Sequence, residues 1–282
     1  MITRRSASFS LAAALGALAL RAQGQQKDPT QWPIVYSVPG MAKARVREGI
    51  VYKTAEGSPL HFDVYAPATA ASAPPAVIFV HGTVPAVGVR RWGVFTSYGR
   101  AVAAMGMVGI VFDHRLLGVE RLRDSATDLA DLVRHVRGTA KTLGFDENRM
   151  ALWAFSGGAS LIASALRERQ KWWKLFVAYY GLMEAQGAGP ELSAIAALGA
   201  DASNAPPIVL ARAGKDDPAL NATIDRFVAT ANSAGATVDL LTHPTGHHGF
   251  DILDPGERSS QIIRRTLEAL RSSFGIAAAQ SG

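Results

Sequence analysis

The chain has 282 residues, of which 48% are hydrophobic and 18% are charged, so it can bury a sizeable core and global disorder is excluded. It contains no cysteine, which excludes a disulfide framework, a thiolate metal site and a cysteine nucleophile. The formal net charge of +6 is not gathered into a basic stripe with interleaved aromatic residues, so no nucleic-acid partner is expected.

Residues 1–24 are arranged like a signal peptide. Arg4 and Arg5 form a basic start, a run of ten apolar residues occupies 11–20, and an Ala-x-Gly cleavage site follows. Ten residues span only about 15 Å as a helix, roughly half of a bilayer core. We therefore expect a secreted or periplasmic protein with no stable membrane anchor after signal cleavage. An uncleaved anchor is the alternative, and the export route stays open.

The next segments predict an extended lead-in followed by an antiparallel hairpin. Residues 25–45 are polar and contain three prolines, which favours an extended segment. Residues 46–65 carry two strand-like runs around a turn at 55–58, and Leu60, Phe62 and Val64 alternate along the second run.

Short apolar runs alternate with helical patterns along the rest of the chain. Runs of five or six residues rich in Val, Ile and Phe are typical of strands buried on both faces of a parallel sheet. They occupy Ala76–Val80, Val108–Phe112, Met150–Phe155, Leu175–Tyr180, Ile208–Ala213 and Val238–Thr242. Helical spacing appears at 129–136, behind a capping box of Ser125 and Asp128, and again at 224–231 and 262–270.

This alternation predicts an α/β fold. We expect one domain over residues 46–275, a doubly wound, mostly parallel sheet with helices on both faces and an antiparallel N-terminal hairpin. The Ala/Gln/Ser-rich tail at 276–282 is expected to be flexible.

A candidate nucleophile stands where the strand at 150–155 gives way to a helical segment reading 159–169. The pentapeptide Ala154-Phe155-Ser156-Gly157-Gly158 is close to the G-x-S-x-G nucleophile elbow. A serine in such a turn has a strained backbone and needs small neighbours two residues before and after it, and the helix start behind it favours negative charge. The alternative is a serine that only caps the helix.

Several segments resemble bacterial secreted α/β-hydrolase esterases of the carboxylesterase, feruloyl-esterase-like and dienelactone-hydrolase-like groups. They are residues 144–153 leading into Ser156, His81-Gly82 after one strand, and the segment 113–116 (Asp-His-Arg-Leu) after the next. The similarity covers about residues 46–274. Two departures are Ala154 in place of the first elbow glycine and the absence of the cysteine nucleophile of dienelactone hydrolases proper.

A serine hydroxyl needs a general base, and histidine suits this role. The candidates are His243, His247 and His248. The resemblance implies His248, which begins a His-Gly-Phe loop, and His247 is the alternative.

The base needs a carboxylate that orients it. Asp216 and Asp217 follow the strand at 208–213, where this fold carries its acid. Relatives give arguments for either aspartate. We choose Asp216 and expect Asp217 to cap the helix that begins near Ala219.

The resemblance also implies an oxyanion hole and pocket walls. The backbone N–H of Gly157 and one from the Gly82-Thr83 turn are the expected oxyanion donors. Residues 83–92 and 182–206 are the expected walls. Tyr180 is a candidate to line the pocket, with a core-edge position as its alternative. Arg90 is a candidate to orient an acidic substrate, with an ordinary surface role as its alternative.

The sequence thus predicts a serine hydrolase that cleaves a small-molecule carboxylic ester through an acyl-enzyme, without a cofactor or a metal. The alternatives are a secreted serine peptidase of the same fold and a catalytically silent hydrolase fold used for binding. Oligomeric state and ester specificity stay open.

Overall fold

The structure is a computed structural model that describes residues 28–70 and 72–277. The predicted signal peptide at 1–24 and the last five residues of the predicted tail, 278–282, lie outside the described residues.

An eight-stranded mixed sheet forms the centre of the molecule, with the strand order β1-β2-β4-β3-β5-β6-β7-β8. The first two strands pair antiparallel to each other, β2 also pairs antiparallel to β4, and all other pairs are parallel. The predicted fold class is therefore confirmed. The strands are β1 (Arg45–Ala55), β2 (Ser58–Ala66), β3 (Ala76–Val80), β4 (Val108–Phe112), β5 (Met150–Phe155), β6 (Trp173–Tyr179), β7 (Ile208–Ala213) and β8 (Val238–His243).

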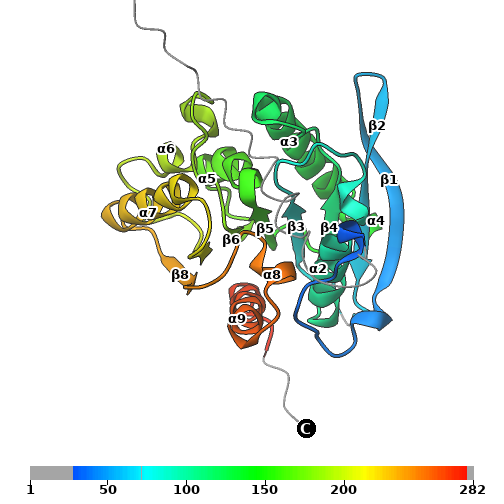
Figure 1. Ribbon diagram of the computed structural model, residues 1–282. Helices are drawn as coiled ribbons and strands as arrows, with labels where there is room; N and C mark the ends of the chain where they lie inside the picture. The colour runs from blue at the N-terminus through cyan, green and yellow to red at the C-terminus, as the bar shows by residue number, and fades with distance from the viewer. Residues whose placement is uncertain (1–27, 71, 278–282) are drawn as a thin grey trace, which may run out of the picture.

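Helices cover both faces of this sheet (Figure 1). They are α2 (Gly93–Ala104), α3 (Leu122–Gly138), α4 (Ala140–Leu143), α5 (Ala163–Glu168), α6 (Ala194–Leu198), α7 (Pro218–Ser233), α8 (Phe250–Leu253) and α9 (Glu257–Ser273). Short 3-10 helices lie at Pro29–Gln31, Met41–Lys43, Val89–Arg91, Val119–Arg121, Ser156–Ile162 and Pro190–Leu192.

Two apolar cores lie on opposite faces of the sheet because alternate side chains of each strand point to opposite sides. One core joins the sheet to α3, α5, α6 and α7, and the other joins it to α2 and α9. Strands β3, β4 and β5 are buried along their whole length, as their continuous apolar runs predict.

The predicted capping box at Ser125 and Asp128 is wrong, because α3 begins three residues earlier, at Leu122. The Ser125 hydroxyl donates to the Arg121 carbonyl inside the helix. The buried carboxylate of Asp128 instead accepts two hydrogen bonds from the Arg115 guanidinium, at 2.9 and 2.8 Å. The pattern of small polar residues is that of a cap, but a distant arginine decides the role of the aspartate.

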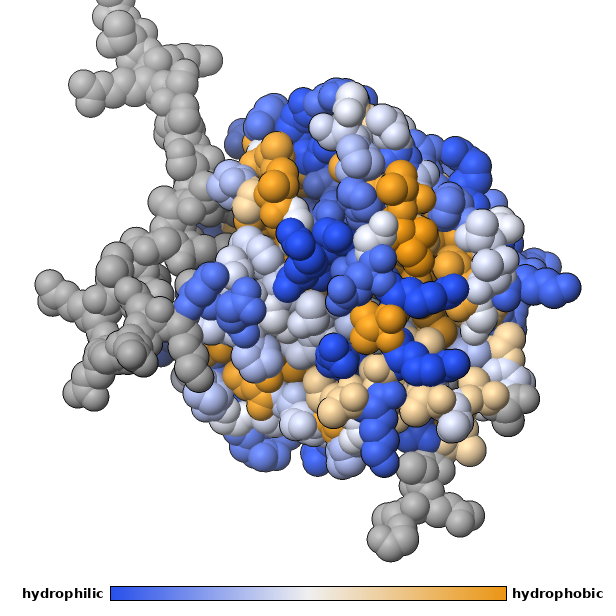
Figure 2. Space-filling view, turned by 90° about the vertical axis from the view of Figure 1, so that its right-hand side faces the viewer, coloured by the Kyte–Doolittle hydropathy of each residue, from blue (hydrophilic) through white to orange (hydrophobic). Residues whose placement is uncertain are grey.

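Strand β1 is one edge of the sheet, and its exposed residues include Arg45, Arg47 and Glu48. On the face shown in Figure 2, hydrophobic residues stand in small groups among hydrophilic ones. Charged side chains along an edge strand oppose pairing with the edge of another sheet.

None of the helices within the described ranges has both the length and the apolarity needed to cross a bilayer.

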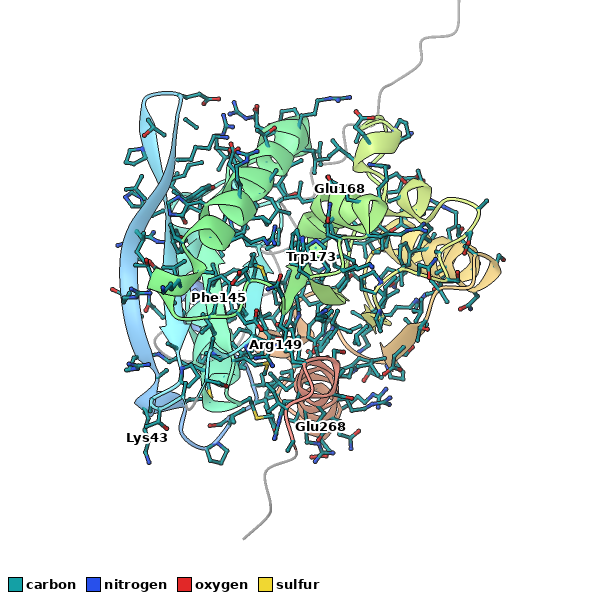
Figure 3. The ribbon with its side chains drawn as sticks, turned by 180° about the vertical axis from the view of Figure 1, so that it is seen from behind. Lys43, Phe145, Arg149, Glu168, Trp173 and Glu268 are labelled. Carbon is teal, nitrogen blue, oxygen red and sulfur yellow. The ribbon has the colours of Figure 1, made fainter. Side chains whose placement is uncertain are left out.

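The amino ends of the parallel strands lie at the end of the sheet opposite to the predicted site. Arg149, Phe145 and Trp173, at or just before the starts of β5 and β6, are labelled in Figure 3. The Arg149 guanidinium donates to the carbonyls of Ala73 and Phe274, at 2.9 and 3.3 Å. These contacts join distant parts of the chain at the amino ends of the strands. The polar groups predicted for catalysis all follow the carboxyl ends of strands, on the opposite side of the sheet.

Candidate active site

Four predicted segments follow the carboxyl ends of parallel strands. Gly82 comes after β3, Ser156 after β5, Asp216 after β7 and His248 after β8. Because the carboxyl ends of parallel strands meet at one edge, segments up to 166 residues apart in sequence approach the same side of the sheet.

Ser156 occupies a strained turn. Its φ of 51° lies in the left-handed region, which a residue with a side chain seldom adopts and which costs roughly 1–3 kcal/mol. It starts the 3-10 helix Ser156–Ile162 directly after β5, whereas the sequence predicts a helix from residue 159. This turn is the geometry expected of a nucleophile elbow.

The glycines around Ser156 allow close approach of three backbone segments. A Cβ on Gly82 would lie 2.8 Å from Ser156 Cβ, and one on Gly158 would lie 2.5 Å from the His81 carbonyl oxygen. A Cβ on Gly157 would lie 2.3 Å from Thr83 Oγ1 and 3.4 Å from Thr83 N. Gly82, Thr83 and Gly157, the predicted oxyanion-hole residues, are therefore brought together beside Ser156.

His248 and Asp216 are in direct contact. The two atoms His248 Nδ1 and Asp216 Oδ2 are 2.7 Å apart, and the Asp216 side chain is 5% exposed. An ionised carboxylate only accepts hydrogen bonds, so His248 donates from Nδ1 and presents Nε2 as the acceptor. Asp217 instead caps α7, where its side chain accepts from Ala219 N at 2.7 Å.

The other two histidines of the cluster have different partners. His247 lies 2.9 Å from Asp254 through Nδ1, and its side chain is 46% exposed. His243 is buried, with its Nε2 3.1 Å from the hydroxyl of Ser259. Of the three candidates, His248 is the one that the structure pairs with a predicted acid.

Ser156 and His248 are not hydrogen-bonded to each other in this structure. Within residues 28–70 and 72–277 the Ser156 hydroxyl has no hydrogen-bond partner, whereas its backbone carbonyl accepts from Leu182 N at 2.9 Å. Catalytic hydrogen bonds commonly tighten only when substrate is bound.

Arg90 is paired with two carboxylates of the fold, and the expectation that it orients an acidic substrate stays a prediction. Its side chain is 10% exposed and contacts Asp63 at 3.1 Å and Asp113 at 2.8 Å. Burial raises the pKa of Asp113, and the Arg90 guanidinium opposes that rise. Arg90 thus ties the loop after β3 to strand β2 and to the segment that follows β4.

Tyr180 is buried beside His248, a position that agrees with its alternative at the edge of the core, and pocket lining stays a prediction. It is 6% exposed, and its hydroxyl donates to Asp251 Oδ1 at 2.9 Å. Its ring lies against the imidazole of His248, with centroids 4.5 Å apart. Asp251 was missed by the sequence reasoning, although its position three residues after His248 is a signal that could have drawn attention to it.

A second missed feature is a pair of stacked histidines beneath the loop after β3. The rings of His81 and His114 lie 3.6 Å apart and nearly parallel, and both side chains are buried. His81 Nδ1 is 2.8 Å from the Gly82 carbonyl, while His81 Nε2 and both ring nitrogens of His114 have no hydrogen-bond partner among the described residues. Burial lowers the pKa of His81 to about 4 and lowers the pKa of His114 well below its ordinary value. Both rings are therefore neutral at pH 7.

A cavity of about 470 Å³ adjoins this pair. It is lined by residues 58–61, His81, residues 86–91, residues 113–115 and Leu117. Part of the predicted wall at 83–92 therefore lines it. His81 is followed directly by Gly82, which approaches Ser156, so one lining residue is adjacent in sequence to the predicted site.

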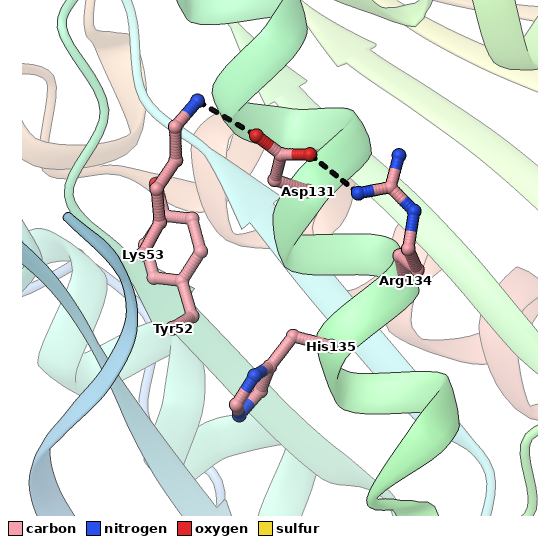
Figure 4. A pocket seen from close by; sticks show the side chains of 5 residues that line it. All are labelled: Tyr52, Lys53, Asp131, Arg134 and His135. Atoms are coloured by element: carbon pink, nitrogen blue, oxygen red, sulfur yellow. Dashed lines mark hydrogen bonds and ion pairs between the residues drawn. The ribbon is translucent and has the colours of Figure 1, made fainter. Parts of the chain in front are cut away.

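Another hollow, of about 330 Å³, lies between β1 and α3 (Figure 4). Its charged groups are paired with one another, since Asp131 contacts Lys53 at 2.7 Å and Arg134 at 2.6 Å. This hollow therefore presents an ion-pair network of the fold. Among the described residues no three His, Asp or Glu side chains are grouped so that they could hold a metal ion.

Part of the chain matches known protein sequences. Residues 62–172 match the family model described as BD-FAE. The chain is 31% identical over 107 residues to a probable isoprenylcysteine alpha-carbonyl methylesterase of Oryza sativa subsp. japonica, covering 38% of this chain and 25% of that protein. It is 30% identical over 125 residues to the isoprenylcysteine alpha-carbonyl methylesterase of Arabidopsis thaliana, covering 44% of this chain and 28% of that protein. The matched region thus spans about a quarter of the length of these relatives.

Solved structures match over most of the fold. The native esterase Est2 of Thermogutta terrifontis aligns with a TM-score of 0.68 at 20% identity, over 86% of this chain and 97% of that chain. Esterase LipW of Mycobacterium marinum aligns with a TM-score of 0.69 at 19% identity, over 83% of both chains. The chain therefore has the α/β-hydrolase fold.

Proposed function

We propose that this protein is a serine hydrolase that cleaves a carboxylic ester through an acyl-enzyme on Ser156. The observation that carries the proposal is the strained turn at Ser156, which lies against the Gly82-Thr83 backbone. The Asp216–His248 pair follows two neighbouring strands at the same carboxyl end of the sheet. The esterases among the similar proteins support the same chemistry.

In the first half-reaction, the Ser156 oxygen attacks the ester carbonyl carbon while His248 Nε2 takes the hydroxyl proton. Asp216 holds the imidazole through Nδ1 and stabilises the imidazolium. The tetrahedral oxyanion accepts hydrogen bonds from the backbone N–H groups of Gly157 and of the Gly82-Thr83 turn, and one such donor is typically worth about 3 kcal/mol. When the carbon–oxygen bond breaks, the alcohol leaves with the proton from His248.

In the second half-reaction, water attacks the acyl-enzyme and gives its proton to His248. The carboxylic acid is released, and the proton returns to Ser156. The neutral His81 and His114 rings keep positive charge away from the interior of the loop, and the Arg90 ion pairs hold that loop against the sheet.

The test is stoichiometric labelling by paraoxon, which phosphorylates a structurally similar esterase from Thermogutta terrifontis. We expect intact-mass labelling of one site and hydrolysis of p-nitrophenyl butyrate, both abolished in Ser156→Ala. Unchanged turnover in Ser156→Ala would contradict the proposal. Absence of both labelling and turnover in the unmodified protein would favour a silent hydrolase fold, and turnover of peptides but not esters would favour a peptidase.

The adjacent aspartates give a matched pair of variants for the acid. Asp216→Asn should lower kcat strongly, by about 10⁴-fold if it behaves as in serine proteases, because the amide favours the wrong imidazole tautomer. Asp217→Asn should keep most of the activity, since asparagine also caps helices well. Equal activity of the two variants would contradict the assignment.

A further inference from the structure

A buried carboxylate lies behind the imidazole of His248. Asp251 has no exposed surface, and it accepts a hydrogen bond from the Tyr98 hydroxyl at 2.8 Å and another from the Tyr180 hydroxyl at 2.9 Å. Burial raises the pKa of Asp251, whereas the two phenol groups and the nearby His248 counteract that rise. Asp251 thus anchors α8, which starts two residues after His248, to two distant elements of the fold.

Tyr180 connects this carboxylate to the imidazole. Its ring faces His248 with centroids 4.5 Å apart and an interplanar angle of 52°. The backbone of Tyr180 has a φ of 38°, in the left-handed region, and its N–H donates to the Ala211 carbonyl at 2.7 Å. Tyr180 is therefore held both at its backbone and at its hydroxyl.

Asp216 alone leaves one freedom to the imidazole. A single hydrogen bond at Nδ1 restrains one edge of the ring, but it allows rocking about the Nδ1–Oδ2 axis. A rigid ring packed against the imidazole restricts that motion. Positioning matters because a displacement of about 1 Å in a catalytic group can cost on the order of 10²-fold in rate.

We propose that Asp251 and Tyr180 are positioning residues for His248. Asp251 fixes the Tyr180 hydroxyl, and the Tyr180 ring sets the orientation in which His248 meets both Asp216 and Ser156. This inference rests on the proposed ester hydrolysis, and it adds two residues that act through the base and need not touch the substrate.

The neighbouring Tyr179 provides a matched control. It is fully buried, and its hydroxyl is 2.7 Å from Thr266 Oγ1 and 3.4 Å from the Ile262 carbonyl oxygen. Among the described residues its aromatic neighbours do not include His248; they are Tyr98, Trp153, Phe155, Tyr180 and Phe250. Tyr180→Phe removes the buried hydrogen bond to Asp251, and Tyr179→Phe removes the buried hydrogen bonds to Thr266 and Ile262; both variants keep the ring. Both should therefore lower Tm, whereas only Tyr180→Phe should disturb His248.

The experiment measures kcat and KM for p-nitrophenyl butyrate hydrolysis and the low-field proton NMR signal of the His248 Nδ1–H. For Tyr180→Phe we expect kcat to fall by roughly tenfold or more with KM within about twofold, together with broadening or loss of the low-field signal. For Tyr179→Phe we expect kcat within about twofold and an unchanged signal. Asp251→Asn should resemble Tyr180→Phe.

Three outcomes separate the possibilities. A selective loss of kcat and of the low-field signal in Tyr180→Phe supports the inference. Equal kcat and equal spectra in Tyr180→Phe and Tyr179→Phe would overturn it and leave these hydroxyls with a structural role. If the unmodified protein neither hydrolyses the ester nor reacts with paraoxon, the proposed function itself fails. That failure is distinguishable from failure of the positioning role, because it is seen in the unmodified protein and not in a comparison of variants.

Discussion

The buried histidine pair makes stability depend on pH in a direction that can be worked out. Burial lowers the pKa of His81 from 6.5 to about 4 and the pKa of His114 well below 6.5. The unfolded chain therefore binds protons at these sites more readily than the folded chain does. The stability that the neutral pair contributes is fully present above pH 6.5 and is lost progressively as the pH falls toward 4.

The size of the effect follows from the same shift. One pKa unit corresponds to about 1.4 kcal/mol, so a fall from 6.5 to about 4 removes on the order of 3 kcal/mol for His81 alone. His114 acts in the same direction. A typical domain has only about 5–15 kcal/mol of stability in total, so the loss is a large fraction of it.

His114→Phe tests the part of this pH dependence that His114 contributes. The substitution keeps a flat ring against His81 and removes two buried nitrogens that have no hydrogen-bond partner in the part of the chain that the structure describes. Urea unfolding followed by tryptophan fluorescence at several pH values between 7 and 4 should show a shallower loss of unfolding free energy, by about 1.4 kcal/mol per pH unit for each proton no longer taken up. His247→Gln, at a partly exposed position, controls for the loss of a histidine. Identical slopes for His114→Phe and the unmodified protein would refute the reasoning.

Two further substitutions test the loop after β3. Gly82→Ala would bring a Cβ to 2.8 Å from Ser156 Cβ, so ester turnover should fall by about 100-fold or more. Gly138→Ala, where no atom lies within 4 Å of the added Cβ, should leave kinetics unchanged, and equal activity of the two would contradict the proposed packing. Arg90→Met leaves the buried Asp63 carboxylate without its positive partner and should lower the unfolding free energy in urea by about 3–5 kcal/mol. A loss below about 1 kcal/mol would argue against the ion pairs.

Local patterns predicted the framework of the sheet closely. The apolar runs at Ala76–Val80, Val108–Phe112, Met150–Phe155 and Ile208–Ala213 coincide with β3, β4, β5 and β7. A strand buried on both faces must be apolar at each position, so its length can be read from the chain itself. The start of α3 was misjudged, because the interpretation of Asp128 as a cap ignored Arg115.

Part of the candidate site was also accessible from the sequence. The order of Ser156, Asp216 and His248, each after its own apolar run, indicated which residues to examine, and a local capping contact separates Asp217 from Asp216. The surroundings of Arg90 and Tyr180 could not be judged in this way. Each contacts a carboxylate at another point of the chain, 27 residues away for Asp63 and 71 for Asp251.

The sequence by itself determined the alternation of strands and helices and the sharp turn at Ser156, because these depend on short-range periodicity and on small neighbours. Only the tertiary structure decided which charges are paired and which ring packs against His248. A side chain's environment is set by whatever packs against it, and Asp251 meets Tyr98 across 153 residues of chain. No local pattern records such a contact, because it exists only once the sheet has brought its carboxyl ends together.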